Sequence, residues 1–171
     1  MVDTVHHLPY NPHFGLNMKI NIYDLDGTVI DSSHRYRTIT ENGKTRIDLE
    51  YWRANEYRAM EDGLLPLAKQ YMADLADKLT FVIVATARVM NAPDWQFMHE
   101  VLGMPNYFIS RKPGDNQSGK TLKIKGLQKI ANLRQFDMSQ ATFYEDNIEY
   151  LKAVCDHFNC RGVYIPSVQG H

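Results

Sequence analysis

Residues 19–31 read KINIYDLDGTVID, and this stretch contains the strongest structural and chemical signal in the chain. A strand-like run ends at Asp24, a second aspartate follows at Asp26, and Gly27-Thr28 come directly after it. Two neighbouring carboxylates repel each other and are normally left in water. Their position at the end of an apolar run therefore predicts that a metal ion, and with it a phosphate, is bound there.

The composition is that of one ordinary globular domain. The chain has 171 residues, 44% hydrophobic and 23% charged, and its 19 basic and 20 acidic residues leave a formal net charge of −1. This balance excludes a global attraction to nucleic acid or anionic membranes, so any basic surface must be local. No apolar run is long enough to span a bilayer, and residues 1–17 lack a secretory signal, which predicts a cytoplasmic protein. We expect residues 1–17 to form a loose extension and residues 18–171 a single domain.

Short β-rich segments alternate with helical patterns from Lys19 onward. The predicted strands are 19–24, 80–86, 106–109, 141–145 and 161–166, and the predicted helices are 64–78, 93–102, 121–133 and 148–158. Residues 81–85 form a continuous apolar run, which is typical of a strand buried on both faces. The alternation predicts an α/β fold of three layers, with helices covering a mostly parallel, Rossmann-like sheet.

The segment between the first two strands is the least regular. Asn42-Gly43 lies between two alternating arms, which is the sequence of a hairpin with a tight primed turn. The stretch from Val29 to Leu79 has room for little more than this hairpin and one helix. We therefore expect a minimal cap, a hairpin flap, above a fairly open site.

The cysteines and histidines carry no metal signal. Cys155 and Cys160 are the only cysteines, and their spacing is not that of a CxxC motif. We expect two packed thiols, with neither a zinc site nor a disulfide. His6, His7 and His13 fall in the N-terminal extension and are not expected to be ligands.

Oxygen-bearing side chains follow three predicted strands. Asp24 and Asp26 end the first, Thr86 ends the second, and Glu145 with Asp146 ends the fourth. In an open α/β sheet, ligands bind at the carboxyl ends of the strands, where the strand order reverses. Four carboxylates and a hydroxyl at one edge suit a hard cation, Mg²⁺ in particular, which would attract a phosphate. The acids at 145 and 146 could also simply cap the following helix.

Paired aspartates can share the work of cleaving a phosphate ester. One carboxylate attacks phosphorus and forms an aspartyl phosphate, which splits one hard displacement into two easier ones. The second carboxylate, two residues further along, protonates the leaving oxygen and then activates water. Gly27 allows a sharp turn after the strand, and the Thr28 hydroxyl fixes that turn by hydrogen bonding.

Three segments resemble the motifs of the haloacid dehalogenase (HAD) superfamily of phosphohydrolases. DLDGT is similar to its first motif, FVIVATAR to its second, and FYEDN to its acidic fourth motif. Residues 19–165 most resemble the phosphatase domain of the phage-type polynucleotide kinase 3′-phosphatases. This closer similarity includes TAR and the segment SRKPGDNQSGKTLKIKGL. The segment resembles the family's Arg-x-x-Gly-Asp loop, which leads into a helix that carries the lysine of the third motif.

The resemblance implies a HAD fold and a role for each matched residue. Asp24 would be the nucleophile and Asp26 the general acid and base, while Thr86 and Lys123 would hold the phosphoryl oxygens. Mg²⁺ would be bound by Asp24, the backbone carbonyl of Asp26, and Asp146. Glu145 would contribute through a metal-bound water. Further expected substrate contacts are Thr28, Arg88, Arg111 and Lys125.

The chain departs from the family pattern at two positions and leaves one assignment open. Glu145 stands where aspartate is commoner, and Ala87 stands where glycine is usual. The phosphate-binding lysine is placed at Lys123 by alignment through the Arg-x-x-Gly-Asp loop, but nearby lysines compete for the role. These competitors are Lys112, Lys120 and Lys125. Only one of them can point inward from a single helix face.

The substrate is less clearly marked than the chemistry. Residues 111–134 contain seven basic residues and one acid, and the hairpin arms add further basic residues. These charges could attract a nucleic-acid end or a nucleotide, or could form a solvated charged helix. Arg88 could equally bind substrate or pair with an acid. Tyr36, Tyr51, Trp52, Tyr57 and Trp95 could stack on a base or pack on the core.

The preferred hypothesis is a Mg²⁺-dependent phosphatase that removes a terminal 3′ phosphate from nucleic-acid ends. A 5′-nucleotidase acting on free mononucleotides is the alternative within the same chemistry. A non-catalytic nucleic-acid-binding module with the same fold is the alternative of another class. An open site would favour a polymer, and a hairpin folded over the site would favour a monomer. No GxxxxGK[ST] sequence is present, so a linked kinase is not predicted.

Overall fold

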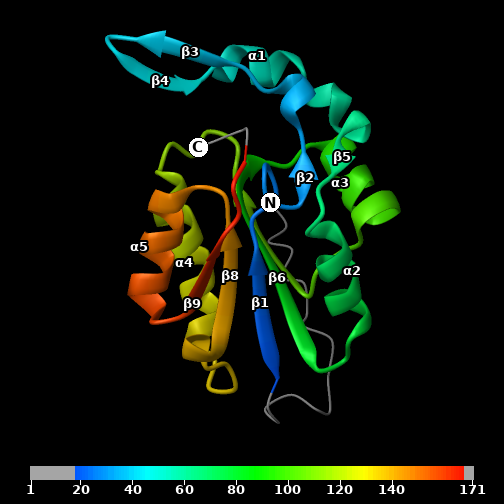
Figure 1. The fold of residues 1–171 in the computed structure, drawn as a ribbon, viewed down its shortest axis with the longest axis vertical. Helices are drawn as coiled ribbons and strands as arrows, with labels where there is room; N and C mark the ends of the chain where they lie inside the picture. Colours follow the sequence, from blue (N-terminus) through cyan, green and yellow to red (C-terminus); the bar gives the residue numbers. More distant parts are fainter. Residues whose placement is uncertain (1–17, 168–171) are drawn as a thin grey trace.

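A five-stranded parallel sheet forms the centre of the computed structural model, which describes residues 18–167 (Figure 1). The strands are β1 (Lys19–Tyr23), β6 (Thr80–Val89), β7 (Tyr107–Arg111), β8 (Ala141–Glu145) and β9 (Arg161–Tyr164). Their order is β7-β6-β1-β8-β9, and every neighbouring pair is parallel. All five predicted strands are confirmed. The chain order reverses beside β1, which is where ligands bind in sheets of this kind.

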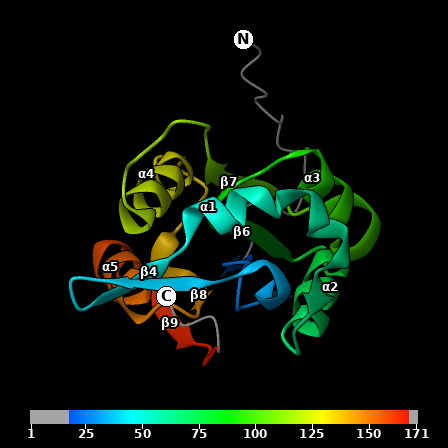
Figure 2. The same ribbon diagram turned by 90° about the horizontal axis from the view of Figure 1, so that it is seen from above.

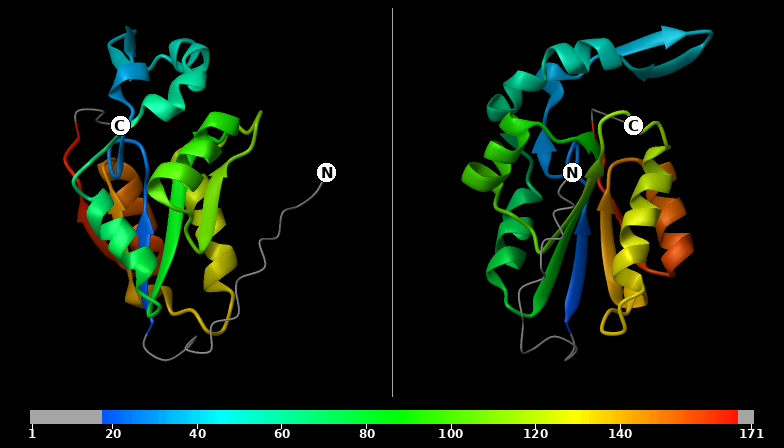
Figure 3. Two further views of the ribbon diagram at one scale, coloured as in Figure 1. Left: turned by 90° about the vertical axis from the view of Figure 1, so that its right-hand side faces the viewer. Right: turned by 180° about the vertical axis from the view of Figure 1, so that it is seen from behind.

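Helices cover both faces of this sheet and complete the predicted three layers. On one face lie α2 (Ala68–Ala76) and α3 (Ala92–Phe97), which continues into the π-helical η3 (Met98–Leu102); on the other lie α4 (Gly119–Ala131) and α5 (Ile148–Phe158) (Figures 1 and 3). The prediction for 148–158 is matched at both ends. The helix predicted from residue 64 begins later, because Leu64 belongs to a short strand.

Successive side chains along the strands pack alternately into two separate hydrophobic cores. Ile20 and Ile22 of β1 pack toward α4 and α5, whereas Tyr23 packs toward α2 and α3. β6 divides in the same way, with Ile83 in the first core and Val84 in the second. Both faces of each central strand are therefore buried, as expected for a parallel sheet between helices. This double burial fixes the strand ends that carry the candidate site.

A cap segment, defined here as residues 32–62, lies over the carboxyl ends of the strands (Figures 1 and 2). It leaves and re-enters the core through β2 (Ile30–Asp31) and β5 (Gly63–Leu64), which pair in antiparallel fashion. Within it follow η1 (Ser33–Arg35), β3 (Thr38–Glu41), β4 (Lys44–Ile47), α1 (Leu49–Ala54) and η2 (Glu56–Glu61).

The predicted hairpin is present, and two short helices extend the cap beyond it. Asn42 and Gly43 both have positive φ angles, 51° and 74°, as a primed turn requires. The helix α1 begins after Asp48, whose carboxylate accepts a hydrogen bond from the Tyr51 backbone N–H. With six residues each, α1 and η2 are too short to show a clear helical period.

Several remaining predictions concern the surface and the termini. The Sγ atoms of Cys155 and Cys160 lie 3.8 Å apart as free thiols, in agreement with the expectation of two packed cysteines. Within residues 18–167, no helix combines the length and apolar character that crossing a bilayer requires. The predicted N-terminal extension, with its three histidines, lies outside the described residues. The last short helix, η4 (Met138–Gln140), precedes β8.

Candidate active site

The first carboxylate of the DLDGT motif is buried directly beyond the end of β1. The Asp24 backbone N–H donates to the Tyr144 carbonyl of β8, which continues the sheet pairing by one residue. Its Oδ2 accepts a hydrogen bond from the Thr28 hydroxyl at 3.0 Å, and its Oδ1 accepts one from the Lys123 ammonium at 2.7 Å. Two donors therefore fix the orientation of the predicted nucleophile. Thr28, predicted as a substrate contact, instead touches Asp24.

Lys123 is the lysine that α4 turns into the site. Its ammonium donates to both Asp24 and Glu145 and lies between the rings of Phe143 and Tyr150, at 5.8 and 5.3 Å. Burial disfavours its charged form, but the two carboxylates raise its pKa above the ordinary lysine value. The competing lysines are elsewhere: Lys112 and Lys125 are exposed, and Lys120 pairs with Glu149 at the surface.

The acidic pair after β8 completes a cluster of three buried carboxylates. One oxygen each from Asp24, Glu145 and Asp146 can be chosen so that all lie within 4.8 Å of one another. Neither carboxylate oxygen of Asp146 accepts a hydrogen bond within the described part of the chain. Burial and the charge of Asp24 raise the pKa of Asp146 to about 7 and that of Glu145 well above its usual value. Lys123 is thus one cation for three carboxylates, and the cluster has an excess of negative charge.

The helix α5 is capped by Asn147 and not by the neighbouring acids Glu145 and Asp146. The side chain of Asn147 caps α5 by accepting a hydrogen bond from the Tyr150 backbone N–H at 3.1 Å. Glu145 Oε1 accepts from the backbone N–H groups of Asp146 and Asn147. Asp146 does not cap the helix, so its carboxylate is available to bind a cation.

Gly27 explains why glycine follows the second aspartate. Its φ of 76° lies in the region that disfavours other residues, and a Cβ at this position would lie 2.2 Å from Asp146 Oδ2. Any side chain here would push the turn away from the acidic pair. The glycine therefore permits the loop after β1 to approach the end of β8 closely.

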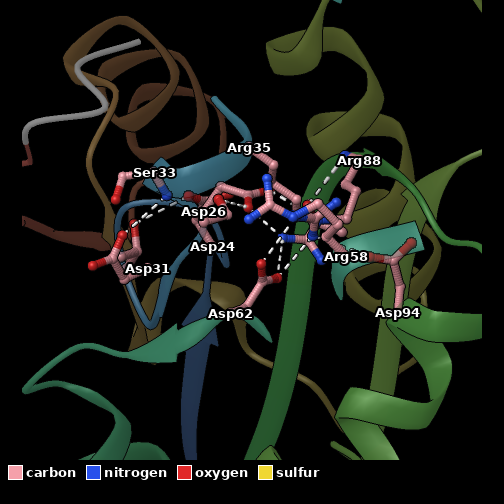
Figure 4. A network of polar contacts seen from close by, with 12 residues as sticks. Asp24, Asp26, Asp31, Ser33, Arg35, Arg58, Asp62, Arg88 and Asp94 are labelled. Carbon is pink, nitrogen blue, oxygen red and sulfur yellow. Dashed lines mark hydrogen bonds and ion pairs between the residues drawn. The ribbon is translucent and has the colours of Figure 1, made fainter. Parts of the chain in front are cut away.

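A second buried cluster of charges surrounds Asp26 (Figure 4). Arg88 donates to both oxygens of Asp26, to Asp94 at 2.8 Å and to Asp62 at 3.5 Å. Arg35 of the cap donates to Asp62 at 2.9 and 2.7 Å and to Asp94 at 3.3 Å. The two arginines and three aspartates, called the arginine cluster below, join the cap to the core.

The arginine cluster determines the charge state of Asp26. Burial alone would raise the pKa of this carboxyl, but the Arg88 guanidinium and a hydrogen bond from the Ser32 hydroxyl lower it to about 2. Asp26 is therefore a carboxylate at neutral pH and can accept a proton. The question whether Arg88 binds substrate or pairs with an acid is answered in part: it pairs with three acids and also lines the cavity.

Thr86 and Arg111 occupy the wall between the two clusters and the loop before α4. Thr86 is buried, and its hydroxyl accepts a hydrogen bond from the Arg88 backbone N–H at 3.1 Å. Arg111 donates to the backbone carbonyls of Ala87, Asp115 and Gln117. Arg111 thereby ties the loop before α4 to the end of β6.

A cavity of about 380 Å³ lies between these strand ends and the cap. Asp24, Lys123 and Glu145 line its charged part, and the cap contributes Ile47, Leu49 and Trp52. This volume falls within the range of about 300–1,000 Å³ that is usual for small-molecule sites. Lys125 is not among its lining residues. The hairpin and the short helices of the cap therefore lie over the site.

The sequence did not point to three of the residues that organise the site. Arg35 appeared only as one basic residue among several, and Asp62 and Asp94 carried no motif. Arg35 is 27 residues from Asp62 and 59 from Asp94, so no local pattern reports their contact. The one available signal is Asn91-Ala-Pro-Asp94, a capping box with proline in the first helical turn, which marks Asp94 as the start of α3.

Comparison with known proteins assigns the chain to a family. The profile of the family described as bacteriophage T5 5′-deoxynucleotidase matches residues 14–108, which is more than half of the chain. The chain belongs to this family. The 5′-deoxynucleotidase of Escherichia phage T5 is 30% identical over 92 residues, covering 52% of this chain and 36% of the relative. The match thus spans about a third of that relative's length. The profile includes the Asp24, Asp26, Thr86 and Arg88 positions and ends before Lys123.

Solved structures with low sequence identity share the fold. A haloacid dehalogenase-like hydrolase from Streptococcus pneumoniae has a TM-score of 0.60 at 12% identity, over 89% of this chain and 88% of that one. A chain of the Pnkp1/Rnl/Hen1 complex has a TM-score of 0.65 at 16% identity, over 96% of this chain and 50% of that one. The fold is therefore that of the HAD-like phosphatases, as the resemblance of the motifs implied.

Proposed function

We propose that the protein is a Mg²⁺-dependent phosphomonoesterase that hydrolyses 5′-deoxynucleoside monophosphates through an aspartyl phosphate on Asp24. The observation that carries this proposal is the combination, at one end of a nucleotide-sized cavity, of Asp24, the Lys123 ammonium 2.7 Å from it, and the unpartnered Asp146 carboxylate. A pure binding protein has no need of a fixed nucleophile. The family relation supports the same chemistry.

Asp24 is the nucleophile in this proposal. A carboxylate oxygen attacks phosphorus, the bond between phosphorus and the ester oxygen breaks, and the nucleoside leaves with a proton. The hydrogen bonds from Thr28 and Lys123 hold the attacking carboxylate in one orientation. Lys123 and Thr86 bind the phosphoryl oxygens, where positive charge offsets the charge that the phosphate brings.

Asp26 moves the protons in both halves of the reaction. In the first half it gives a proton to the leaving oxygen, and in the second half it removes a proton from the water that attacks the aspartyl phosphate. Its pKa of about 2 keeps it deprotonated at neutral pH, as the second role requires, but makes it a weak base. Both roles therefore require that the negatively charged phosphate weaken the hold of Arg88 and raise the pKa of Asp26.

The acidic cluster fits a Mg²⁺ ion. Asp24 and Asp146 would hold it together with the backbone carbonyl of Asp26, and Glu145 would support it through water. Carboxylate and carbonyl oxygens are the ligands that Mg²⁺ prefers, and the unpartnered oxygens of Asp146 would gain a counter-charge. When bound, the ion supplies charge neutralisation that lets an anionic phosphate approach an anionic nucleophile.

The cap favours a mononucleotide as the substrate. It roofs the cavity with Ile47, Leu49 and Trp52, and the volume of about 380 Å³ suits one nucleotide. Removal of a 3′ phosphate from nucleic-acid ends stays a prediction of the sequence. The exposed lysines that suggested a polymer, Lys112 and Lys125, do not line the cavity.

Phosphate release from a matched panel tests the proposal. The panel consists of 5′- and 3′-deoxynucleoside monophosphates and of oligonucleotides with a 5′ or a 3′ phosphate, each with Mg²⁺ and with EDTA. We expect the highest kcat/KM for 5′-mononucleotides and loss of activity in EDTA. Preference for the 3′-phosphorylated oligonucleotide would favour end repair instead. Tight binding of nucleic acid without turnover would identify a binding module.

A further inference from the structure

A large apolar side chain of the cap is exposed to the cavity rather than packed. Leu49, the first residue of α1, is 45% exposed and lines the cavity together with Ile47. Trp52 follows three residues later on the same face of α1 and also lines the cavity. We name Ile47, Leu49 and Trp52 the apolar roof. Apolar surface kept open inside a cavity marks a place for an apolar part of a ligand.

The indole of the apolar roof is held rigidly. The guanidinium of Arg35 lies 4.4 Å from the centroid of the Trp52 ring, and that of Arg88 lies 5.5 Å from it. Trp52 is only 9% exposed, so its position is set by the arginine cluster beneath the cap. A rigid aromatic platform costs little conformational entropy when a ligand binds. Arg88, which orients Asp26, and Arg35 therefore also fix the indole of the roof.

We propose that the apolar roof binds the nucleobase of the substrate through the flat face of the base. This inference rests on the proposed function and deepens it. Every base offers an apolar π-face, so contact through the face does not depend on which base is present. Ile47 and Leu49 carry no side-chain hydrogen-bonding group with which to read the edge of a base. The roof thus favours phosphate esters that carry a base over sugar phosphates that lack one.

A comparison of two leucine variants tests the roof. Leu49→Ala removes part of the roof, and Leu64→Ala is its control, because Leu64 has the same 45% exposure, lies in β5 and does not line the cavity. The substrates are the four 5′-deoxynucleoside monophosphates and 2-deoxyribose 5-phosphate, which lacks a base. Kinetics give kcat/KM, and calorimetry with the Asp24→Asn variant gives binding without turnover.

The expected results separate the base from the phosphate. Each of the four nucleotides should have a kcat/KM well above that of 2-deoxyribose 5-phosphate. Leu49→Ala should lower the ratio of nucleotide to sugar-phosphate kcat/KM by about 5- to 20-fold, whereas Leu64→Ala should leave the ratio unchanged.

Two results would overturn the inference while leaving the proposed function intact. One is equal turnover of nucleotides and 2-deoxyribose 5-phosphate, and the other is an equal loss on both substrate classes in Leu49→Ala. Absence of turnover with every phosphate ester would instead contradict the proposed function. In that case calorimetry still decides the inference, because equal binding of dAMP and 2-deoxyribose 5-phosphate would exclude a base site.

Discussion

Two buried charge clusters lie on either side of the DLDGT motif, and they differ in completeness. The acidic cluster has one cation, Lys123, for the three carboxylates of Asp24, Glu145 and Asp146. In the arginine cluster, Arg35 and Arg88 serve three aspartates, each of which accepts a hydrogen bond from an arginine. The first cluster has two more carboxylates than cations, whereas the second has only one more. This difference indicates that the acidic cluster can bind a cation, whereas the arginine cluster stabilises the structure.

The arginine cluster also joins two parts of the molecule. Arg35 and Asp62 belong to the cap, whereas Arg88 and Asp94 belong to β6 and α3 (Figure 4). Burying charges is expensive unless every one is paired, so the cluster is stable only when cap and core are in contact.

The largest expected effect comes from the acidic cluster, through the variant Asp24→Asn. The amide keeps the size of the side chain but is a poor nucleophile, so turnover should fall by about 10⁴-fold or more. Binding of nucleotide should persist, because the charged lysine and the roof remain. Phosphate release and calorimetry with dAMP measure the two properties separately. Activity near that of the unaltered protein would remove Asp24 from its assigned role.

The next effect breaks the arginine cluster through Arg88→Met. The substitution leaves three buried carboxylates with only Arg35, which should lower the free energy of unfolding by about 3–5 kcal/mol. The pKa of Asp26 should rise, because burial would no longer be opposed by the guanidinium. Urea unfolding measures the stability change.

Arg58→Met provides the control for that experiment. Arg58 lies in the cap, and its ion pair with Glu61 is partly exposed to water. Such pairs contribute about 0–1 kcal/mol, so this variant should unfold almost like the unaltered protein. An equal loss of stability in the two variants would show that the buried cluster has no special role in attaching the cap.

The acidic cluster and the arginine cluster also differ in how far the sequence predicts them. Asp24, Asp26, Glu145 and Asp146 stand in short motifs at the ends of strands, and strand ends meet at one edge of a parallel sheet. The carboxylates of the acidic cluster were therefore predictable residue by residue. Lys123 was assigned only through the resemblance of the Arg-x-x-Gly-Asp loop, with three other lysines left open. The strands were predictable because continuous apolar runs mark buried parallel strands.

The arginine cluster was not predictable, because its members lie far apart in the chain. Arg88 and Asp26 are 62 residues apart, and nothing near either residue indicates the other. The helices of the cap were missed for another reason: α1 and η2 have six residues each, so packing rather than periodicity determines them. The roof over the site depends on these short elements, and so does the proposed preference for a mononucleotide substrate.

A smaller expected effect, thermal stabilisation by Mg²⁺, tests whether the acidic cluster binds the ion. Mg²⁺ should raise the Tm, and the stabilisation should approach about 2.7 kcal/mol at a concentration 100 times its Kd. Asp146 has a pKa of about 7 when folded and an ordinary value of 3.8, so the metal-free protein loses stability as the pH rises between these values. Protons compete with Mg²⁺ for this carboxylate.

The gain in Tm with Mg²⁺ should therefore be larger at pH 8 than at pH 5.5. Differential scanning fluorimetry measures it, with Asp146→Ala and Asp137→Ala as the test and control variants. Asp137 caps the short helix η4 and is not one of the three clustered carboxylates. A gain that persists unchanged in Asp146→Ala would place the ion elsewhere.

The smallest expected effect concerns the lysine that the sequence left in competition. Lys125 is exposed on α4 and does not line the cavity, so Lys125→Ala should change kcat/KM for 5′-mononucleotides by less than about twofold. Lys123→Ala should cost far more, because it leaves Asp24 and Glu145 buried without their cation. Steady-state kinetics at two salt concentrations make this comparison. If Lys125→Ala impaired only a 3′-phosphorylated oligonucleotide, and more strongly at low salt, the basic helix would be guiding a polymer to the site after all.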